Sequence, residues 1–142
     1  MRSFESFLEK GEVRERTPNP GQAENLIKKA EKRLRYARNR EITEENSDLV
    51  LEDCYEAIRE TIDAFMANQG FKSYNHEATI VFAFEELELE YNTANQLNKL
   101  RKLRNDSKYR GEEIRRQEAE GSIEIAEKLI PELRERFYRD EE

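Results

Sequence analysis

Cysteine and histidine each occur only once in this 142-residue chain, as Cys54 and His76. One cysteine cannot form an intrachain disulfide, and it also excludes a metal site built from a cluster of cysteines. One histidine cannot build a metal site without carboxylate partners, and the sequence identifies none. We therefore expect no metal and no cofactor. Because Cys54 falls among apolar residues at helical spacing, we interpret it as a core residue.

Long hydrophobic runs are also missing. No stretch approaches the roughly 18 apolar residues that are needed to cross a bilayer. The first residues, MRSFESFLEKGEVRER, lack the uninterrupted apolar segment of a secretory signal. Since a lone cysteine fits a reducing compartment, we expect a cytoplasmic protein with no membrane partner.

Glycine and proline are scarce, with 5 Gly and 3 Pro, and residues that favour helices dominate. This composition predicts an all-α protein. Large apolar residues are few as well: the chain has 9 Ile, 12 Leu, 3 Val and 7 Phe. Such a thin core predicts economical placement of the apolar side chains and completion of the core by a second subunit, so we expect a homodimer.

The formal net charge of −7 hides a segregation of charge along the chain. Residues 28–40 carry seven basic side chains against one acid, Glu31, and residues 99–110 carry six against Asp106. Acid gathers in residues 85–90 and 140–142. A local field steers an anion more than net charge does, so the two basic segments are compatible with a phosphate ligand. Solvated helix faces that bind nothing are the commoner origin of such runs.

Apolar residues recur at helical spacing in five long segments, and no strand is expected. We expect helices over residues 20–40, 43–70, 75–91, 93–109 and 112–137. The pair Thr93 and Gln96 predicts a capping box at the start of the fourth helix, and Pro131 should kink or split the last. The sequence therefore predicts an up-and-down helical bundle of about five helices. Residues 1–142 form a single domain, with residues 1–18 as a leader packed on the bundle or extending from it.

The fourth predicted helix contains an arginine in an unusual place. At 100° per residue, Arg104 falls only about 40° from the mean direction of the leucines of this helix. A guanidinium keeps its charge, so near an apolar stripe it needs a carboxylate, backbone oxygens or a phosphate as its partner. Asn105 and Tyr109 share the neighbouring side of the helix. Guanidinium, amide, phenol and ammonium groups thus gather in residues 104–110, a combination suited to phosphate binding.

Around Arg104, and in two earlier stretches, the sequence resembles the HEPN domain family. The stretch LRKLRNDSKYRGEE resembles the family's signature helix, which carries an arginine, a polar residue after it, and a histidine four to six residues further on. The stretch LVLEDCYEAIRETIDAFMANQGFKSYNHEATIVF resembles the family's central helix pair. The stretch FLEKGEVRERTPNPGQAENLIKKAEKRLRYA resembles the leader and first helix of prokaryotic members. The resemblance covers nearly the whole chain.

The resemblance implies a helical bundle that dimerises, so that two copies of the arginine helix face a shared cleft. Active members are metal-independent RNases, many of them in toxin–antitoxin or defence systems, and other members partner a minimal nucleotidyltransferase. Arg104 matches the motif arginine and Asn105 the polar residue after it. The candidate catalytic residues are Arg104, Asn105 and Tyr109. The candidate phosphate-binding residues are Arg101, Arg104, Lys108 and Arg110.

The motif histidine is absent, because positions 108–110 hold Lys, Tyr and Arg. A phenol with a pKa near 10 is a poor general base at neutral pH, and Lys108 would need a strongly lowered pKa to serve as one. We therefore expect binding of RNA or nucleotide phosphate, with metal-independent endoribonuclease activity weak or absent. We interpret His76 as a residue that caps or packs at a helix start. Its approach to the cleft from another helix is the alternative.

Two further hypotheses stay open. In the first, the chain is a non-catalytic partner module of a minimal nucleotidyltransferase, and the acidic residues 85–90 meet a basic partner. In the second, the chain is an ordinary helical dimer in which Arg104 pairs with an acid across the interface. A closed salt bridge at Arg104, with no cleft beside it, would favour this structural role.

Overall fold

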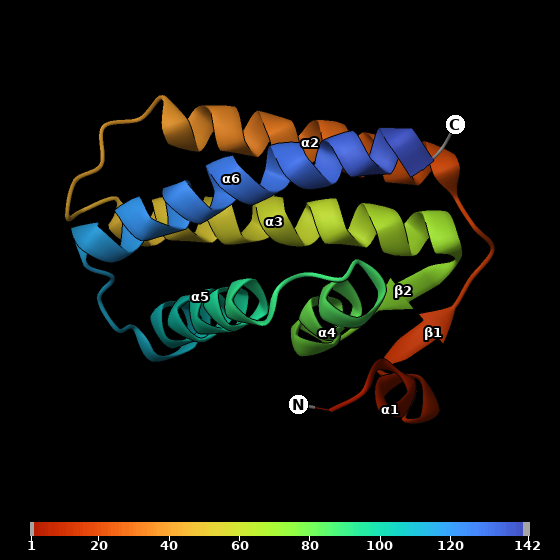
Figure 1. The fold of residues 1–142 in the computed structure, drawn as a ribbon. Coiled ribbons are helices and arrows are strands. Elements are labelled where there is room, and N and C mark those ends of the chain that lie inside the picture. The colour runs from red at the N-terminus through yellow and green to blue at the C-terminus, as the bar shows by residue number, and fades with distance from the viewer. Residues whose placement is uncertain (1, 141–142) are drawn as a thin grey trace.

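The computed structural model describes residues 2–140, which form six helices and one pair of short strands (Figure 1). In chain order they are α1 (Phe4–Glu9), β1 (Val13–Glu15), α2 (Pro20–Arg38), α3 (Ser47–Gln69), β2 (Phe71–Ser73), α4 (His76–Glu86), α5 (Tyr91–Arg110) and α6 (Arg116–Asp140). The predicted all-α bundle is confirmed. None of the helices within residues 2–140 combines the length and the apolar character that crossing a membrane requires.

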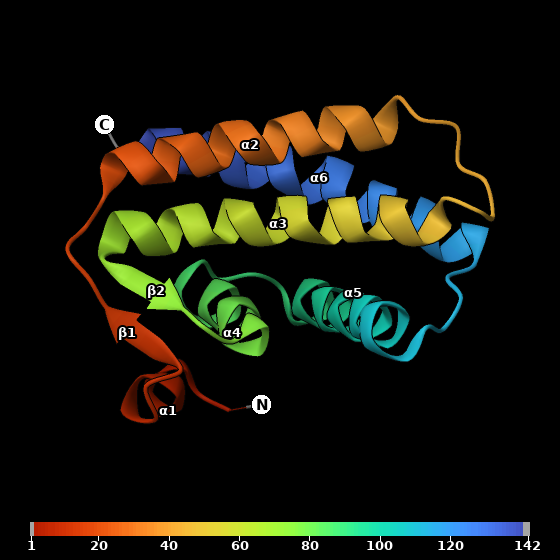
Figure 2. The ribbon, with the colours of Figure 1, turned by 180° about the vertical axis from the view of Figure 1, so that it is seen from behind.

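Helix α3 is the centre of the bundle. It packs against α2 and α6 on one side and against α4 and α5 on the other (Figures 1 and 2). Its apolar side chains are buried at helical spacing, as the sequence predicts: Leu51, Cys54, Tyr55, Ile58, Ile62, Phe65 and Met66. In Figure 2, α3 lies in front of α6, between α2 above and α4 and α5 below. Its polar residues lie on the face between α2 and α5, which positions the candidate site.

The hydrophobic core closes within one chain. The buried apolar side chains form a single cluster to which every helix contributes. Within residues 2–140, the exposed large hydrophobic residues are Leu49 and four tyrosines, Tyr36, Tyr74, Tyr91 and Tyr109. The scarcity of apolar residues is therefore met by economical placement. A second subunit is not needed to cover this core, and dimerisation stays a prediction from the family resemblance alone.

A short antiparallel strand pair is the element that the sequence did not predict. Val13 pairs with Ser73, Arg14 with Lys72 and Glu15 with Phe71. The chain reaches β2 through Gly70, which ends α3 as predicted, in the left-handed conformation with φ of +88°. A Cβ at Gly70 would lie 2.5 Å from the carbonyl oxygen of Arg16. Only glycine fits this turn, which holds the segment before α2 against the end of α3.

The N-terminal residues pack on the bundle through α1. The ring of Phe4 meets the rings of Phe71 and Phe82 edge-on, with centroids 5.3 Å apart in both pairs. The backbone N–H of Phe4 donates to Oε2 of Glu85 at 2.9 Å. These contacts attach α1 to β2 and α4 (Figure 1).

The start of one helix was predicted correctly and that of another was not. Asn75 caps α4, because its Oδ1 accepts hydrogen bonds from the N–H groups of Glu77 and Ala78 at 2.8 and 3.2 Å. The capping box predicted at Thr93 is wrong. Helix α5 begins earlier, at Tyr91, with Glu90 in the cap position, so Thr93 lies inside the first turn.

Proline does not split the last helix. Helix α6 is continuous from Arg116 to Asp140, with Pro131 inside it. Leu129, Ile130 and Leu133 are buried on both sides of the exposed proline. Packing of this apolar face onto the bundle stabilises the helix across Pro131, which offsets the lost backbone hydrogen bond.

Candidate functional site

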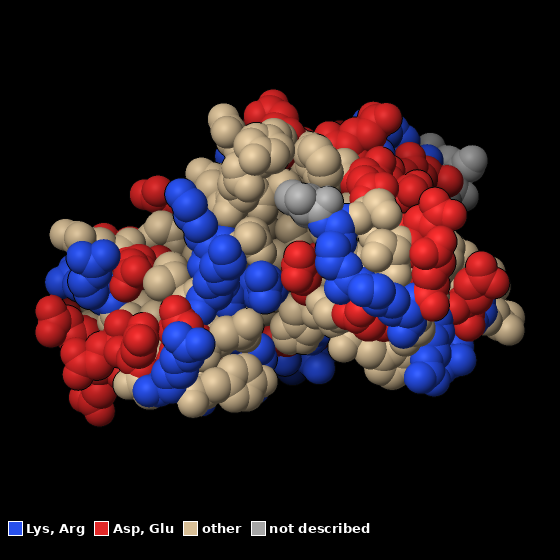
Figure 3. Space-filling view, turned by 90° about the horizontal axis from the view of Figure 1, so that it is seen from below, with Lys and Arg blue, Asp and Glu red and all other residues tan. Residues whose placement is uncertain are grey.

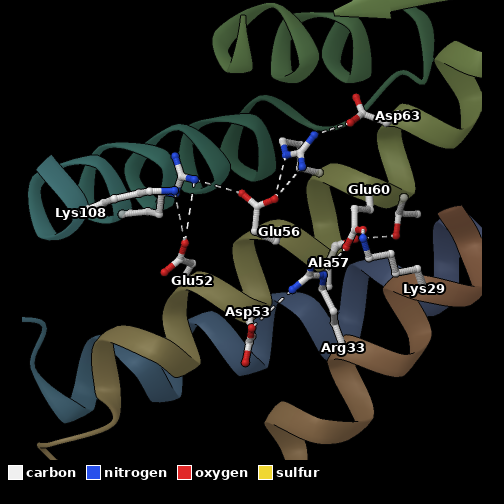
Figure 4. A network of polar contacts seen from close by, with 12 residues as sticks. Lys29, Arg33, Glu52, Asp53, Glu56, Ala57, Glu60, Asp63 and Lys108 are labelled. Carbon is white, nitrogen blue, oxygen red and sulfur yellow. Dashed lines mark hydrogen bonds and ion pairs between the residues drawn. The ribbon is translucent and has the colours of Figure 1, made fainter. Parts of the chain in front are cut away.

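A stripe of four charged residues runs along the polar face of α3. Glu52, Glu56, Arg59 and Asp63 recur every three or four residues, so their side chains lie on one side of the helix. Figure 4 shows Glu52 and Glu56 pointing toward α5. The side chains are partly withdrawn from solvent: 37% of Glu52, 13% of Glu56 and 22% of Asp63 is exposed.

Arg104 of α5 points into this stripe. Only 7% of the residue is exposed. Its Nη2 lies 3.4 Å from Oε1 of Glu56 and 4.0 Å from Oε1 of Glu52. Its Nη1 donates a hydrogen bond to Oδ1 of Asn105 at 3.3 Å. Both acids belong to the same chain, so Arg104 does not require a carboxylate from a second subunit.

The carboxylate of Glu56 is held mainly by Arg59. Its Oε2 accepts from Nη2 and Nε of Arg59 at 2.6 and 3.2 Å. Nη1 of the same guanidinium donates to Asp63 at 2.5 Å. Burial by itself would raise the pKa of Glu56, but the hydrogen bond and charge of Arg59, together with the charge of Arg104, hold it below its usual value. Glu56 is thus a charged acid shared by two arginines. Arg59 makes two hydrogen bonds to it, whereas Arg104 makes only an ion pair at 3.4 Å.

Tyr55 and His76 complete the surroundings of Arg104. Cζ of Arg104 lies 5.8 Å from the ring centroid of Tyr55, and the His76 ring centroid lies 5.8 Å from the same ring. Burial, followed by the positive charge of Arg59 and of Arg104, lowers the pKa of His76. The imidazole is therefore neutral at pH 7. His76 does approach the arginine from α4, but no hydrogen bond joins its side chain to another group within residues 2–140.

Three buried polar atoms near this point have no hydrogen-bond partner within the described chain. They are Oη of Tyr55, Oε1 of Glu56 and Nε of Arg104. Buried polar atoms are almost always satisfied, so three neighbouring exceptions are informative. A guanidinium has five N–H donors, and only one of those of Arg104 makes a hydrogen bond within residues 2–140. Arg104 is neutralised by its acids but remains short of acceptors.

Part of the basic segment at residues 28–40 is neutralised by the other side of α3. Glu60 contacts Nζ of Lys29 at 3.5 Å and Nε of Arg33 at 2.5 Å. Asp53 contacts Arg33 and Arg40 at 3.6 and 3.1 Å. Figure 4 shows Asp53 and Glu60 directed toward α2. Three of the seven cations in this segment therefore link it to α3.

Of the remaining candidate residues on α5, only Lys108 shares an acid with Arg104 within residues 2–140. Lys108 contacts Glu52 at 3.7 Å, whereas Arg101 donates to Asn98 at 2.9 and 3.0 Å. On the outer side, a hollow of about 380 Å³ is lined by Lys102, Asn105, Asp106, Tyr109 and Arg110. The motif thus divides into an inward set, Arg104 and Lys108, and an outward set that includes Asn105, Tyr109 and Arg110.

The outer surface over α5 is basic in spite of the net charge. The space-filling view in Figure 3 shows a column of Lys and Arg side chains on the half of the molecule that α5 occupies. Acidic side chains gather toward both ends of this face. Tyr109 is 70% exposed beside Lys108, whose Nζ lies 5.9 Å from its ring centroid. An exposed aromatic ring beside cations suits a base or a phosphate.

The sequence did not predict that acids of α3 would face Arg104, whereas the approach of His76 from another helix was the stated alternative. The spacing of Glu52, Glu56, Arg59 and Asp63 was a usable signal, because polar residues repeated every three or four positions on a central helix must share a face. Which helix would face that stripe depends on the packing of α3 against α5. The periodicity of one helix does not contain that information.

The architecture is that of an all-α domain in which the polar face of the central helix α3 meets the helix α5 that carries Arg104. A comparison with protein families gives the same class: the family model of the HEPN domain matches residues 23–136. This chain belongs to the HEPN family. Domains of this family are often RNases or nucleotide-binding proteins of toxin or defence systems. No curated protein and no solved structure matches the chain.

Proposed function

We propose that this HEPN domain binds RNA through its phosphate groups, as a homodimer, and does not cleave it. The observation that carries the proposal is the guanidinium of Arg104, which is nine-tenths buried, makes one hydrogen bond and two loose ion pairs, and has a buried Nε with no hydrogen-bond partner within residues 2–140. A buried arginine with open N–H groups gains more from an added phosphate oxygen than one with complete partners.

The outer side of α5 supplies a second set of phosphate-binding groups, and Asn105, which accepts a hydrogen bond from Arg104, connects the two sets. Lys102 and Arg110 carry exposed cations, and Asn105 offers an amide beside them. Asp106 offsets part of this charge through its contact with Arg110 at 3.8 Å. Tyr109 is placed to stack on a base. The surface suits a nucleic-acid strand, because it combines phosphate-binding groups with a flat ring over one helix.

Cleavage lacks a suitable base. Attack by a 2′-hydroxyl needs a group that accepts its proton at neutral pH. Burial raises the pKa of Tyr55, which makes its phenol a weaker acid and keeps it protonated. Lys108 is paired with Glu52. His76 is neutral but belongs to α4, and no hydrogen bond within residues 2–140 orients it toward Arg104.

Fluorescence anisotropy with a labelled single-stranded RNA tests this function. Arg104→Lys keeps the charge but loses the fork of donors, and we expect it to weaken RNA binding about tenfold or more. Lys102→Ala should reduce the slope of log affinity against log salt by about one. Arg139→Ala removes an exposed charge from α6 and serves as the matched control. Unchanged affinity in Arg104→Lys, with the fold intact by circular dichroism, would refute the proposal.

The same preparations test the dimer and the absence of cleavage. Light scattering after size exclusion should give twice the 17.0 kDa chain mass. Incubation with RNA in the presence of EDTA should leave the RNA intact in both the parent and Arg104→Lys. Metal-independent cleavage that disappears in Arg104→Lys would show that the domain is an RNase and that the non-catalytic assignment is wrong.

A partner module of a minimal nucleotidyltransferase is the second candidate, and an acidic hollow favours it. Glu88, Glu90, Glu132 and Glu135 line a depression of about 460 Å³ between the α4–α5 connection and α6. Lys128, Arg136 and Arg139 offset part of this charge. A basic protein surface would complement the depression. Here co-expressed nucleotidyltransferase should co-purify with the parent and with Arg104→Lys, but not with a Glu88→Lys, Glu132→Lys double variant.

A further inference from the structure

A second hollow lies far from α5 along the chain, where the strand pair meets the ends of α2 and α3. Its volume is about 580 Å³. It is lined by Arg16, Thr17, Asn19, Gln22, Leu26, Arg59, Asp63, Met66, Ala67, Phe71, Lys72 and Ser73. None of the residues predicted from the HEPN motif contributes to it. Figure 1 places this end of the molecule at β1 and β2, opposite the connection from α5 to α6.

The cations of the strand pair have no acidic partner within residues 2–140. Arg14 and Lys72 are directly opposite each other on β1 and β2, and no carboxylate lies within 4.0 Å of either, or of Arg16. Like charges placed opposite each other destabilise a strand pair. This arrangement differs from α2, where Asp53 and Glu60 neutralise the neighbouring cations.

The three cations surround one exposed ring. Nη2 of Arg16 donates to Oη of Tyr74 at 2.9 Å. Cζ of Arg14 and Nζ of Lys72 lie 5.1 and 5.6 Å from the ring centroid. The hydrogen bond from Arg16 is the largest cause of a lowered pKa for Tyr74, and the charges of Arg16, Lys72 and Arg14 add to it. Two of these three cations, Arg16 and Lys72, also line the hollow.

The field inside the hollow is positive as well. Arg16 and Lys72 line it without an acidic partner within residues 2–140, whereas Arg59, which also lines it, is paired with Asp63 and Glu56 at 2.5 and 2.6 Å. The N-terminus of α2 opens onto the same space through Asn19 and Gln22, and its first turn carries no acid that would offset the helix dipole. The positive end of α2 and the cations Arg16 and Lys72 therefore face the same hollow.

Part of the lining of the hollow is apolar. Leu26, Met66, Ala67 and Phe71 contribute to the lining. A volume of several hundred cubic ångströms fits a small molecule rather than a bare ion. The combination of a cationic rim and a partly apolar lining selects a ligand that has an anionic group joined to a flat or apolar body.

We propose that this hollow binds a small phosphate monoester, with the phosphate held by Arg16 and Lys72 at the end of α2 and an apolar or aromatic body against Leu26, Met66 and Phe71. The phosphate would supply the counter-charge that the strand pair lacks, and it would meet charge-assisted donors from an arginine and a lysine. None of the residues that would hold the phosphate contacts Arg104, and the hollow is linked to Arg104 through Arg59 and Glu56.

Titration calorimetry with the full chain tests the site, using phenyl phosphate and adenosine 5′-monophosphate as two sources of the same chemistry. Binding of either monoester, at least about tenfold tighter than inorganic phosphate or adenosine, supports the proposal. Lys72→Ala and Arg16→Ala should each weaken that binding about tenfold. Lys32→Ala removes an exposed cation from α2 away from the hollow and should change nothing.

Amide chemical shifts locate the bound monoester. Shifts at Thr17, Gln22 and Ser73 support the site, whereas shifts confined to α5 overturn it. Absence of binding by both monoesters, or equal binding by inorganic phosphate, also overturns it. Arg104→Lys should retain monoester binding and Lys72→Ala should retain RNA binding, so failure of this site and failure of the RNA-binding proposal are distinguishable.

Discussion

A double-mutant cycle on Arg104 and Glu56 measures how firmly the chain itself holds the motif arginine. Arg104→Met keeps the length of the apolar stem and removes the charge, and Glu56→Gln keeps the shape of the carboxylate. At 3.4 Å, two unit charges in an effective dielectric constant of about 20 attract by roughly 5 kcal/mol. Desolvation and competition from Arg59 offset much of this. We expect a coupling energy of about 1–2 kcal/mol.

The single variants should cost less than the breaking of an isolated buried pair. Removal of one partner from such a pair costs about 3–5 kcal/mol, because it leaves an uncompensated charge. After Arg104→Met, Glu56 keeps Arg59, and Glu52 keeps Lys108. We therefore expect a loss of about 2 kcal/mol for Arg104→Met, midway between a surface pair and an orphaned buried charge.

Urea unfolding followed by circular dichroism supplies the four free energies of the cycle. The pair Arg104 and Glu60 is the control, since Glu60 faces α2 (Figure 4) and its coupling to Arg104 should stay within about 0.5 kcal/mol of zero. A coupling between Arg104 and Glu56 no larger than that of the control would show that the ion pair does not exist in solution. The account of a partly neutralised, partly unsatisfied guanidinium would then fail.

Three other changes follow from the buried and strained positions. Burial raises the pKa of Cys54 to about 11. A disulfide reagent at pH 8 should therefore react with Cys54 only as fast as the protein unfolds. Reaction of the folded protein at the rate of a free thiol would contradict the burial. The folded state lowers the pKa of His76. The free energy of unfolding should therefore fall as pH drops below about 6.5, the pKa of an unfolded histidine. The difference in this free energy between the parent and His76→Gln should change over that pH range, and a difference that does not depend on pH would exclude the effect. Gly70→Ala should cost more than about 2 kcal/mol, because φ is +88° and the added Cβ would meet backbone at 2.5 Å. Gly111→Ala, with φ of +68° and open space around it, should cost only about 1 kcal/mol, and equal losses in urea unfolding would exclude the steric term.

Helical elements were predictable because their signals are local. The buried stripe of α3 and the capping role of Asn75 follow from spacing and side-chain chemistry within a few residues. The strands were not predictable, since three polar-rich residues carry no period. Their pairing depends on the turn at Gly70, which brings residues almost sixty positions apart into register. Such pairing is a property of the packed chain rather than of either segment.

The arginine itself was predicted from the helical wheel, but its partners were not. The sequence identifies Arg104 as a cation close to an apolar stripe, and burial confirms that position. It cannot show that Glu52 and Glu56 supply the countercharge, because they lie about fifty residues away on another helix. Their nearness follows from the side-by-side packing of α3 and α5.

The distinction between paired and unpaired cations decides where an anion can bind on a chain of negative net charge. In residues 28–40, the acids of α3 already contact Lys29, Arg33 and Arg40, so three of the seven cations of this basic segment are paired across helices. At the strand pair, Arg14 and Lys72 face each other without an acid within residues 2–140, and their repulsion is a cost of folding that an anion would offset. Counting charges along the chain ranks the α2 segment first. Pairing in the folded state narrows that difference, because the work of bringing a phosphate to a cation depends on whether a carboxylate already lies beside it.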